Sequence, residues 1–168
     1  MHTECENTFP IELYIMPLLN EDLAPGLILK NNDNFYVVIT PACDLAKHNG
    51  TRKAKDVQLC CIDSVVEIFP EDNSSTRRKR QSAIKNQNNM YHYLPKCKIF
   101  AGGLINFNKI ITVNISEIEK QETSYTAVAK ISLPYLKNIL ARFAMYYSRQ
   151  GQPDILVDID QEITICPR

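Results

Sequence analysis

Apolar residues occur along most of the chain in short runs, and several of these runs alternate with polar positions. Short runs bounded by proline, glycine or polar turns are typical of β-strands. The pattern predicts strands at 11–16, 27–30, 35–40, 57–69, 90–94, 97–100, 110–115, 125–131 and 155–159. The polar residues Asn31–Asn34 are expected to join two of these strands into a hairpin, and the long run at 57–69 is expected to bend at Asp63 and Ser64.

The strongest helical pattern lies between Ser132 and Gln150. Ser132 can cap its start, Pro134 is tolerated in the first turn, and the segment 151–153 contains the glycine and proline that favour an end. At about 100° per residue, one side gathers Leu136, Ile139, Leu140, Phe143, Tyr146 and Tyr147. The opposite side carries Asn138, Arg142, Met145 and Arg149. The apolar side is expected to pack on the sheet, which leaves the other side for water or for a partner.

The composition changes sharply between Pro70 and Asn89. Acids, hydroxyl residues, cations and amides dominate this segment, and Ile84 is its one large aliphatic residue. The segment is therefore expected to be a long mobile loop or an exposed helix. Together these patterns predict an α+β fold: a strongly bent, mainly antiparallel sheet or small open barrel with one packed C-terminal helix. We expect a single domain over residues 1–168, with 1–10 loosely ordered.

The charge balance, the hydropathy and the cysteines indicate the cellular compartment and the kinds of partner to expect. The 19 basic and 19 acidic side chains cancel, so any binding to nucleic acid or to anionic lipid must come from a local patch. No apolar run reaches the roughly 18 residues of a membrane span. The first residues are acidic and polar, unlike a secretory signal. We therefore expect a cytoplasmic protein that does not contact membrane and whose six cysteines are reduced thiols.

The most suggestive polar cluster follows the strand predicted at 35–40, where Cys43 and Asp44 stand. A group at the end of a buried strand is held rigidly and is still open to solvent. Cys43 would be a thiolate nucleophile if His92 served as its base and Asp44 oriented that histidine. Alternatively, Cys43 is a packed thiol, Asp44 forms a turn and His92 is bonded at a loop junction. The sequence leaves both interpretations open.

A metal site is not expected, and no cofactor is implied. Cys60 and Cys61 are adjacent on a predicted strand, so their side chains point to opposite faces and are not expected to coordinate the same metal ion. Cys43 and His48 are five residues apart, which is not the usual spacing of zinc ligands.

The basic segment is the candidate for nucleic-acid contact, and it consists of Arg77, Arg78, Lys79, Arg80 and Lys85. Adjacent cations repel one another, so a folded domain keeps them exposed. They would contact phosphates, and the amides that follow them would contact bases. The alternative is a solvated loop without a ligand.

Three segments resemble a group of uncharacterised bacterial proteins: 38–45 (VITPACDL), 91–95 (YHYLP), and the residues LPYL, RF and RQG within 133–151. The resemblance spans roughly residues 26–154. It implies a link to signalling and phage-defence gene clusters, and it implies no known activity.

Two further segments, 25–29 (PGLIL) and 37–40 (VVIT), resemble the first strand and the valine-rich strand of PemK/MazF-like toxins. Those toxins are small SH3-like barrels that cut RNA, so this resemblance implies an SH3-like open barrel. The basic and proline residues that usually precede the valine-rich strand are absent here, as is the family's early glutamate. The resemblance therefore bears on architecture more than on nuclease activity.

These observations favour a non-catalytic binding or regulatory module of a bacterial defence or signalling assembly. It would contact a protein partner through Asn138, Arg142, Met145 and Arg149, or nucleic acid through the basic segment. The alternative is an enzyme, either a hydrolase that uses Cys43 and His92 or an RNA-cutting toxin.

Overall fold

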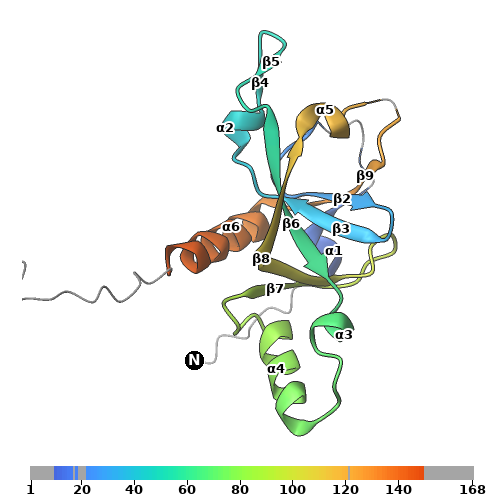
Figure 1. The fold of residues 1–168 in the computed structure, drawn as a ribbon, viewed down its shortest axis with the longest axis vertical. Coiled ribbons are helices and arrows are strands. Elements are labelled where there is room, and N and C mark those ends of the chain that lie inside the picture. The colour runs from blue at the N-terminus through green and yellow to red at the C-terminus, as the bar shows by residue number, and fades with distance from the viewer. Residues whose placement is uncertain (1–9, 17, 19–21, 121, 150–168) are drawn as a thin grey trace, which may run out of the picture.

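The computed structural model describes residues 10–16, 18, 22–120 and 122–149. Its centre is an antiparallel sheet of seven strands in the order β1-β9-β2-β3-β6-β8-β7, which is strongly bent and open (Figure 1). The strands are β1 (Tyr14–Ile15), β2 (Leu27–Asn31), β3 (Asn34–Val38), β6 (Asp56–Asp63), β7 (Tyr91–Leu94), β8 (Gly103–Asn114) and β9 (Tyr125–Ile131). A separate hairpin consists of β4 (Lys47–His48) and β5 (Thr51–Arg52). The predicted α+β fold with a bent antiparallel sheet is confirmed.

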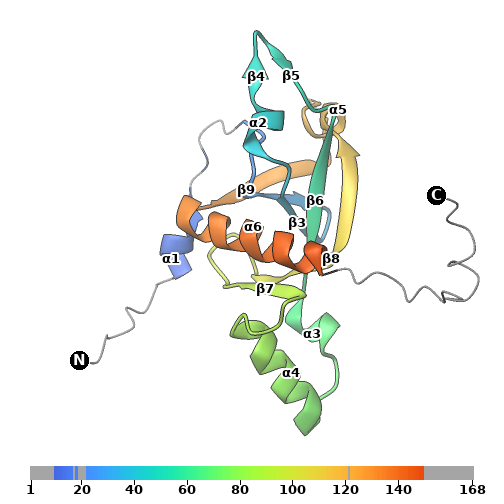
Figure 2. The same cartoon turned by 90° about the vertical axis from the view of Figure 1, so that its left-hand side faces the viewer.

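Helices cover parts of this sheet. They are α1 (Pro10–Leu13), α2 (Ala42–Leu45), α3 (Val65–Ile68), α4 (Ser74–Ile84), α5 (Ile115–Ile118) and α6 (Leu133–Ser148). Figure 2 shows α6 lying across one face of the sheet, with α4 beyond the edge strand β7. None of the helices in the described residues is long and apolar enough to cross a membrane.

The predicted hairpin is present as β2 and β3. Its strands pair from Ile28 with Val37 to Asn31 with Asn34, so the turn is only two residues long. Asn32 adopts a left-handed conformation with φ of 53°. Asparagine tolerates this region, which tight hairpin turns of right-handed twist require.

Two strand predictions were wrong in part. Residues 11–13 belong to α1, which begins at Pro10, and only Tyr14 and Ile15 pair with β9. The segment 57–69 is a strand as far as Asp63, where the bend was expected. Ser64 then caps α3 through a capping box with Glu67, so residues 65–68 are helical.

Other segments between the strands also differ from the prediction. No strand forms at 97–100; the amide of Cys97 donates to the carbonyl of Phe100, and the side chain of Phe100 is buried. The segment 70–89 forms an exposed helix, α4, one of its two predicted states. β8 begins at Gly103 and is longer than the predicted 110–115. The predicted strand 155–159 and most of the loosely ordered start at 1–10 lie outside the described residues.

The largest apolar cluster lies between α6 and the sheet. Leu136 and Ile139 of α6 are buried there with Ile28, Phe107 and Ile131. A second cluster is built around β2, β6 and the short helices α2 and α5. A third joins α3 and α4 to the edge of the sheet through Phe69, Ala83 and Leu104.

Helix α6 follows its predicted bounds closely, but three side chains lie differently. Tyr147, predicted on the packed side, is 43% exposed. Arg142, predicted on the open side, is half-buried and bonded to a neighbouring loop. Ser132 stands at the N-cap, yet its hydroxyl donates to the carbonyl of Glu12 instead of capping α6. For Arg142 and Ser132, a partner far away in the chain decided where the side chain points.

Candidate functional site

The structure does not bring Cys43 and His92 together. Sheet register aligns His92 with Ile105, Ile105 with Ile62, and Ile62 with Phe35 at the start of β3. Cys43 stands in α2, beyond the opposite end of β3. Both views in Figures 1 and 2 place α2 at one end of the sheet and β7 at the other. The predicted pairing of a thiol with an imidazole base is therefore not assembled.

The surroundings of Cys43 are those of an exposed turn. Its thiol is 3.7 Å from the Asp44 carboxylate, and that carboxylate is 3.6 Å from the ammonium of Lys53. Asp44 thus contacts its own neighbours rather than His92. Cys60 and Cys61 are buried on β6, and burial raises the pKa of both thiols. All four cysteines of the described segments are free thiols.

His92 is buried beneath α6, on the same face of β7 as Leu94. Burial, and secondly the positive charge of Arg142, lower the pKa of His92 from its usual 6.5 to about 4. Its Nδ1 atom is buried and has no hydrogen-bond partner among the described residues. Tyr91 and Tyr93 point to the other face and pack on the cluster beneath α4. The alternation predicted for this strand is confirmed, and it places His92 in the core.

The basic segment divides into two groups on α4. Arg77 makes a two-pronged ion pair with Asp72, at 2.8 and 2.9 Å. Arg80 donates to the carbonyl oxygens of Phe69 and Glu71, at 2.8 and 3.4 Å. These two arginines hold the connection from α3 to α4.

The remaining cations, Arg78, Lys79 and Lys85, are exposed and have no hydrogen bond or ion pair within the described chain. On a helix, residues three and four apart share a face. Arg78 and Lys79 therefore lie one turn before Ser82, and Lys85 lies one turn after it. We call these three residues the cationic ridge.

The loop from Asn86 to Tyr91 joins α4 to β7, and Arg142 of α6 fastens it. The guanidinium donates to the carbonyl of Asn86 at 2.8 Å, to that of Asn88 at 2.7 Å and to that of Tyr91 at 2.9 Å. The Asn86 side chain accepts from the amide of Tyr93 at 2.7 Å. These bonds fix the loop and also occupy backbone groups of the edge strand β7.

The sequence of this loop explains why it turns here. Asn86 has a φ of 57°, and its amide and that of Gln87 bond back to the carbonyls of Ala83 and Ser82. This is the Schellman pattern that ends a helix on a left-handed residue. Asn88 then accepts the amide of Met90 through its side chain at 2.8 Å, which closes a second turn.

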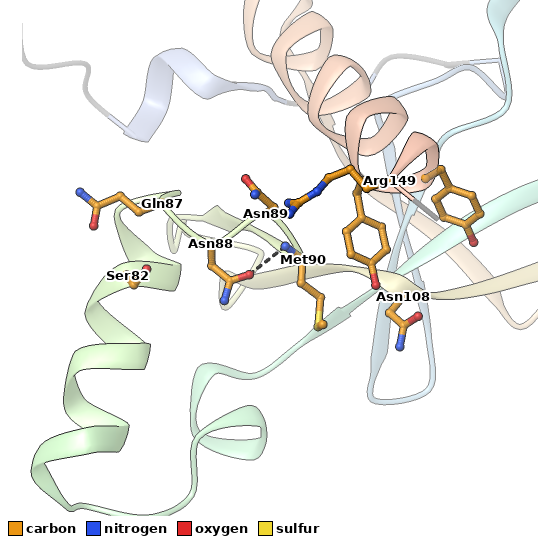
Figure 3. Close-up of a pocket in the computed structure, with 9 residues that line it drawn as sticks. Ser82, Gln87, Asn88, Asn89, Met90, Asn108 and Arg149 are labelled. Carbon is orange, nitrogen blue, oxygen red and sulfur yellow. Dashed lines mark hydrogen bonds between the residues drawn. The ribbon is translucent and has the colours of Figure 1, made fainter. Parts of the chain in front are cut away.

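A cleft of about 560 Å³ opens beside this loop. Its lining is mostly uncharged and polar on one side and aromatic on the other, and it consists of Ser82, Gln87, Asn88, Asn89, Met90, Asn108, Tyr146, Tyr147 and Arg149. Figure 3 shows Arg149 reaching from the end of α6 toward Asn89, while Gln87 points away from the other lining side chains. The cleft thus lies between α4, β8 and the last turn of α6, and we call it the amide cleft.

The rings of the two tyrosines that line the amide cleft pack against other aromatic rings. The ring of Tyr146 packs on Phe107 at 6.2 Å and on Tyr147 at 6.0 Å. The ring of Tyr147 lies 4.8 Å from that of Phe143. Aromatic pairs at these separations stabilise each other. The partly exposed ring of Tyr147 is therefore held in place on α6.

A second cavity, of about 600 Å³, lies near the β2–β3 turn and α3. Three of its four charged lining residues have partners, whereas Asp33 has none in the described structure. Asp63 accepts from Lys109 and from Asn106, both at 2.9 Å. Glu67 accepts the backbone amide of Ser64 in the capping box. Since these carboxylates serve the fold, the amide cleft is the better candidate for a ligand site.

The predicted site residues are thus distributed over the molecule. Arg149 and the cationic ridge lie at or next to the amide cleft, and Arg142 fastens its loop. Asn138 and Met145 are exposed on α6, whereas Cys43 and Asp44 lie at the other end of the sheet. Sequence reasoning gave the amides at 86–89 only a secondary role and did not find Asn108. The dense run of amides after α4 was the available signal.

No group of three or more His, Cys, Asp or Glu residues placed to hold a metal ion occurs among residues 10–149 as far as they are described. Comparisons with models of protein families, with curated proteins and with solved structures find no match to this chain. The proposal for its function therefore rests on the geometry of the site.

Proposed function

We propose that this domain is a non-catalytic binding module that contacts nucleic acid through the amide cleft and the cationic ridge. We keep the setting that the sequence suggested, a bacterial defence or signalling assembly, as part of the proposal. The observation that carries it is the position of three exposed cations: Arg78 and Lys79 on α4 and Lys85 at its C-cap, each one helical turn from Ser82, the residue of α4 that lines a polar and aromatic cleft.

The division of charge on α4 supports this proposal. Arg77 and Arg80 are engaged by a carboxylate and by backbone carbonyls, so they serve the local fold. The cations of the ridge have no side-chain hydrogen bond or ion pair in the described structure. They lie one helical turn from Ser82, which lines the cleft. Exposed cations beside a polar groove are what a phosphate backbone requires.

Two further observations favour binding over catalysis and nucleic acid over a protein partner. The thiol of Cys43 and the imidazole of His92 lie at opposite ends of the sheet, so the proposed hydrolase lacks its base. The face of α6 predicted to meet a protein is interrupted, because Arg142 is turned into the loop after α4.

The test is a binding titration with fluorescently labelled RNA and DNA at several salt concentrations. Changing Arg78, Lys79 and Lys85 together to glutamine should weaken binding and reduce the slope of log K against log salt by about two, since each phosphate contact on a single strand contributes about 0.7. The stability of the variant, measured by urea unfolding, should stay near that of the wild type because the three side chains are exposed.

The matched control changes three exposed lysines away from the cleft, Lys55, Lys120 and Lys137, to glutamine. The net charge falls by the same amount, so a general electrostatic effect would weaken binding equally in both variants. Equal loss in the two variants, or no binding by the wild type at low salt, would reject the proposal.

A further inference from the structure

Resting on the proposed function, we propose that the amide cleft holds one unpaired base of a single-stranded polynucleotide. Tyr147 provides the stacking surface, the amide side chains of Asn89 and Asn108 bond to the edge of the base, and Arg149 with the cationic ridge contacts the adjoining phosphates. The ligand chemistry is thus a flat heteroaromatic ring on a phosphodiester chain.

The aromatic wall is suited to stacking because its support is already in place. Tyr147 packs on Phe143 with ring centroids 4.8 Å apart and on Tyr146 at 6.0 Å, yet 43% of its surface remains open. A ring that is already fixed loses little freedom when a base stacks on it. Stacking on aromatic side chains is a common way in which proteins bind unpaired bases.

The cleft also offers hydrogen-bonding groups of the matching kind, on the loop after α4 and on β8. Asn89 and Asn108 are exposed in the cleft, and no hydrogen bond of their side-chain amides is recorded in the described structure. A primary amide can donate and accept at once, which is how asparagine and glutamine pair with base edges. The side-chain oxygen of Asn88 is already used by Met90, so Asn88 shapes the wall instead.

The size and rigidity of the cleft agree with this use. Its volume of about 560 Å³ lies within the roughly 300–1,000 Å³ typical of small-molecule sites. Arg142 holds the loop at Asn86, Asn88 and Tyr91, so the wall that carries Asn89 is fixed before a ligand arrives. A duplex would not use this cleft, because its base faces are stacked and only its edges are open.

The experiment compares single strands of about eight nucleotides with the corresponding duplex, using RNA and DNA arms. Tyr147→Leu keeps an apolar side chain on Phe143 but removes the flat ring, and Tyr147→Phe keeps the ring. Tyr147→Leu should weaken single-strand binding by about 5- to 100-fold, whereas Tyr147→Phe should stay within about twofold of the wild type. Asn108→Ala should change the order of affinity among homopolymers.

Each outcome separates this inference from the function on which it rests. If single strand and duplex bind equally, and Tyr147→Leu equals the wild type, the base-holding inference is wrong while nucleic-acid binding stands. If no RNA or DNA binds, both proposals fail. A difference between the RNA and DNA arms, with the Tyr147 effect intact, identifies which polynucleotide is the ligand. Thermal melting of each variant confirms that it is folded.

Discussion

At one end of the sheet, Cys43 and Asp44 follow β3, and the polar contacts of their side chains are 3.6 Å or longer. At the other end, the loop from Asn86 to Tyr91 is fastened to α6 by three hydrogen bonds of at most 2.9 Å from Arg142. Both segments are polar connections beside a strand. They differ in which residues fix them: Arg52, only seven residues along the chain, donates to the carbonyl of Leu45 at the end of α2 at 2.8 Å, whereas Arg142 lies more than 50 residues from the loop that it binds.

This difference matters for any candidate site. Ligand and catalytic groups must be held within a fraction of an ångström to function, and packing or hydrogen bonds to a rigid element provide that restraint. The Asn86–Tyr91 loop has three such bonds from α6. The α2 turn is held by Arg52 and by the buried side chain of Leu45, but these restraints do not act on the exposed side chain of Cys43. Residue chemistry alone pointed to the turn, whereas the supporting contacts favour the loop.

The largest effect is expected from Arg142→Met, which keeps the apolar stem but removes the guanidinium. Three carbonyls lose a charged donor, so the free energy of unfolding should fall by about 3–5 kcal/mol. Asp44→Ala at the other end should change it by less than about 0.5 kcal/mol, because its ion pair is exposed. Urea unfolding measures both, and similar values for the two variants would remove the distinction between the ends.

The next effect concerns pH. Because the pKa of His92 is about 4 in the folded protein and about 6.5 in the unfolded chain, the unfolded state binds more protons between these values. Stability is therefore highest above about pH 6.5 and falls by about 3 kcal/mol as the pH drops toward 4. Stability curves of the wild type and of His92→Leu should diverge over this window.

The exposed His48 on β4 offers the control at the other end of the sheet. His48→Gln replaces an exposed histidine and is the matched variant at that end. A wild-type curve that runs parallel to the His92→Leu curve between pH 6.5 and 4 would show that His92 is not buried as described.

The smallest effect compares one substitution at two glycines. Gly50→Ala, in the β4–β5 turn with φ of +82°, has open space around a new Cβ and adds only backbone strain of about 1 kcal/mol. Gly102→Ala, with φ of +77°, would also bring its Cβ within 2.8 Å of the backbone of Leu94 and Lys96. It should cost about 2 kcal/mol more than Gly50→Ala, measured as the difference in unfolding free energy. Equal losses of unfolding free energy in the two variants would mean that the backbone near Gly102 shifts to accommodate the new Cβ without further destabilisation.

The fold could be anticipated where a local signal was strong and unopposed. The hairpin around Asn32 follows from two runs of β-favouring residues joined by turn residues, and α6 follows from its apolar stripe. The N-terminal strand was predicted too long, because Pro10 starts a helix and β9 pairs with only two of its residues. The strand at 57–69 ended early because Ser64 and Glu67 form a capping box, a signal that was present in the sequence.

The candidate site was harder to predict. The cations at 77–80 were visible as a run, but which of them are engaged depends on Asp72 and on the carbonyl of Phe69. Arg142 was assigned to the open side of α6 because helical periodicity does not register a loop that comes from 50 or more residues away. For the same reason Asn108, on a strand, was not linked to the amides after α4.

The sequence by itself determined most of the strands, the β2–β3 hairpin and helix α6, because backbone propensity and the burial of apolar stripes act over a few neighbouring residues. The tertiary structure alone decided that Cys43 and His92 stand at opposite ends of the sheet. It also decided that Arg142 fixes the loop of the amide cleft. Contacts of that kind join residues far apart in the chain, and their geometry depends on strand order and register, which no local pattern encodes.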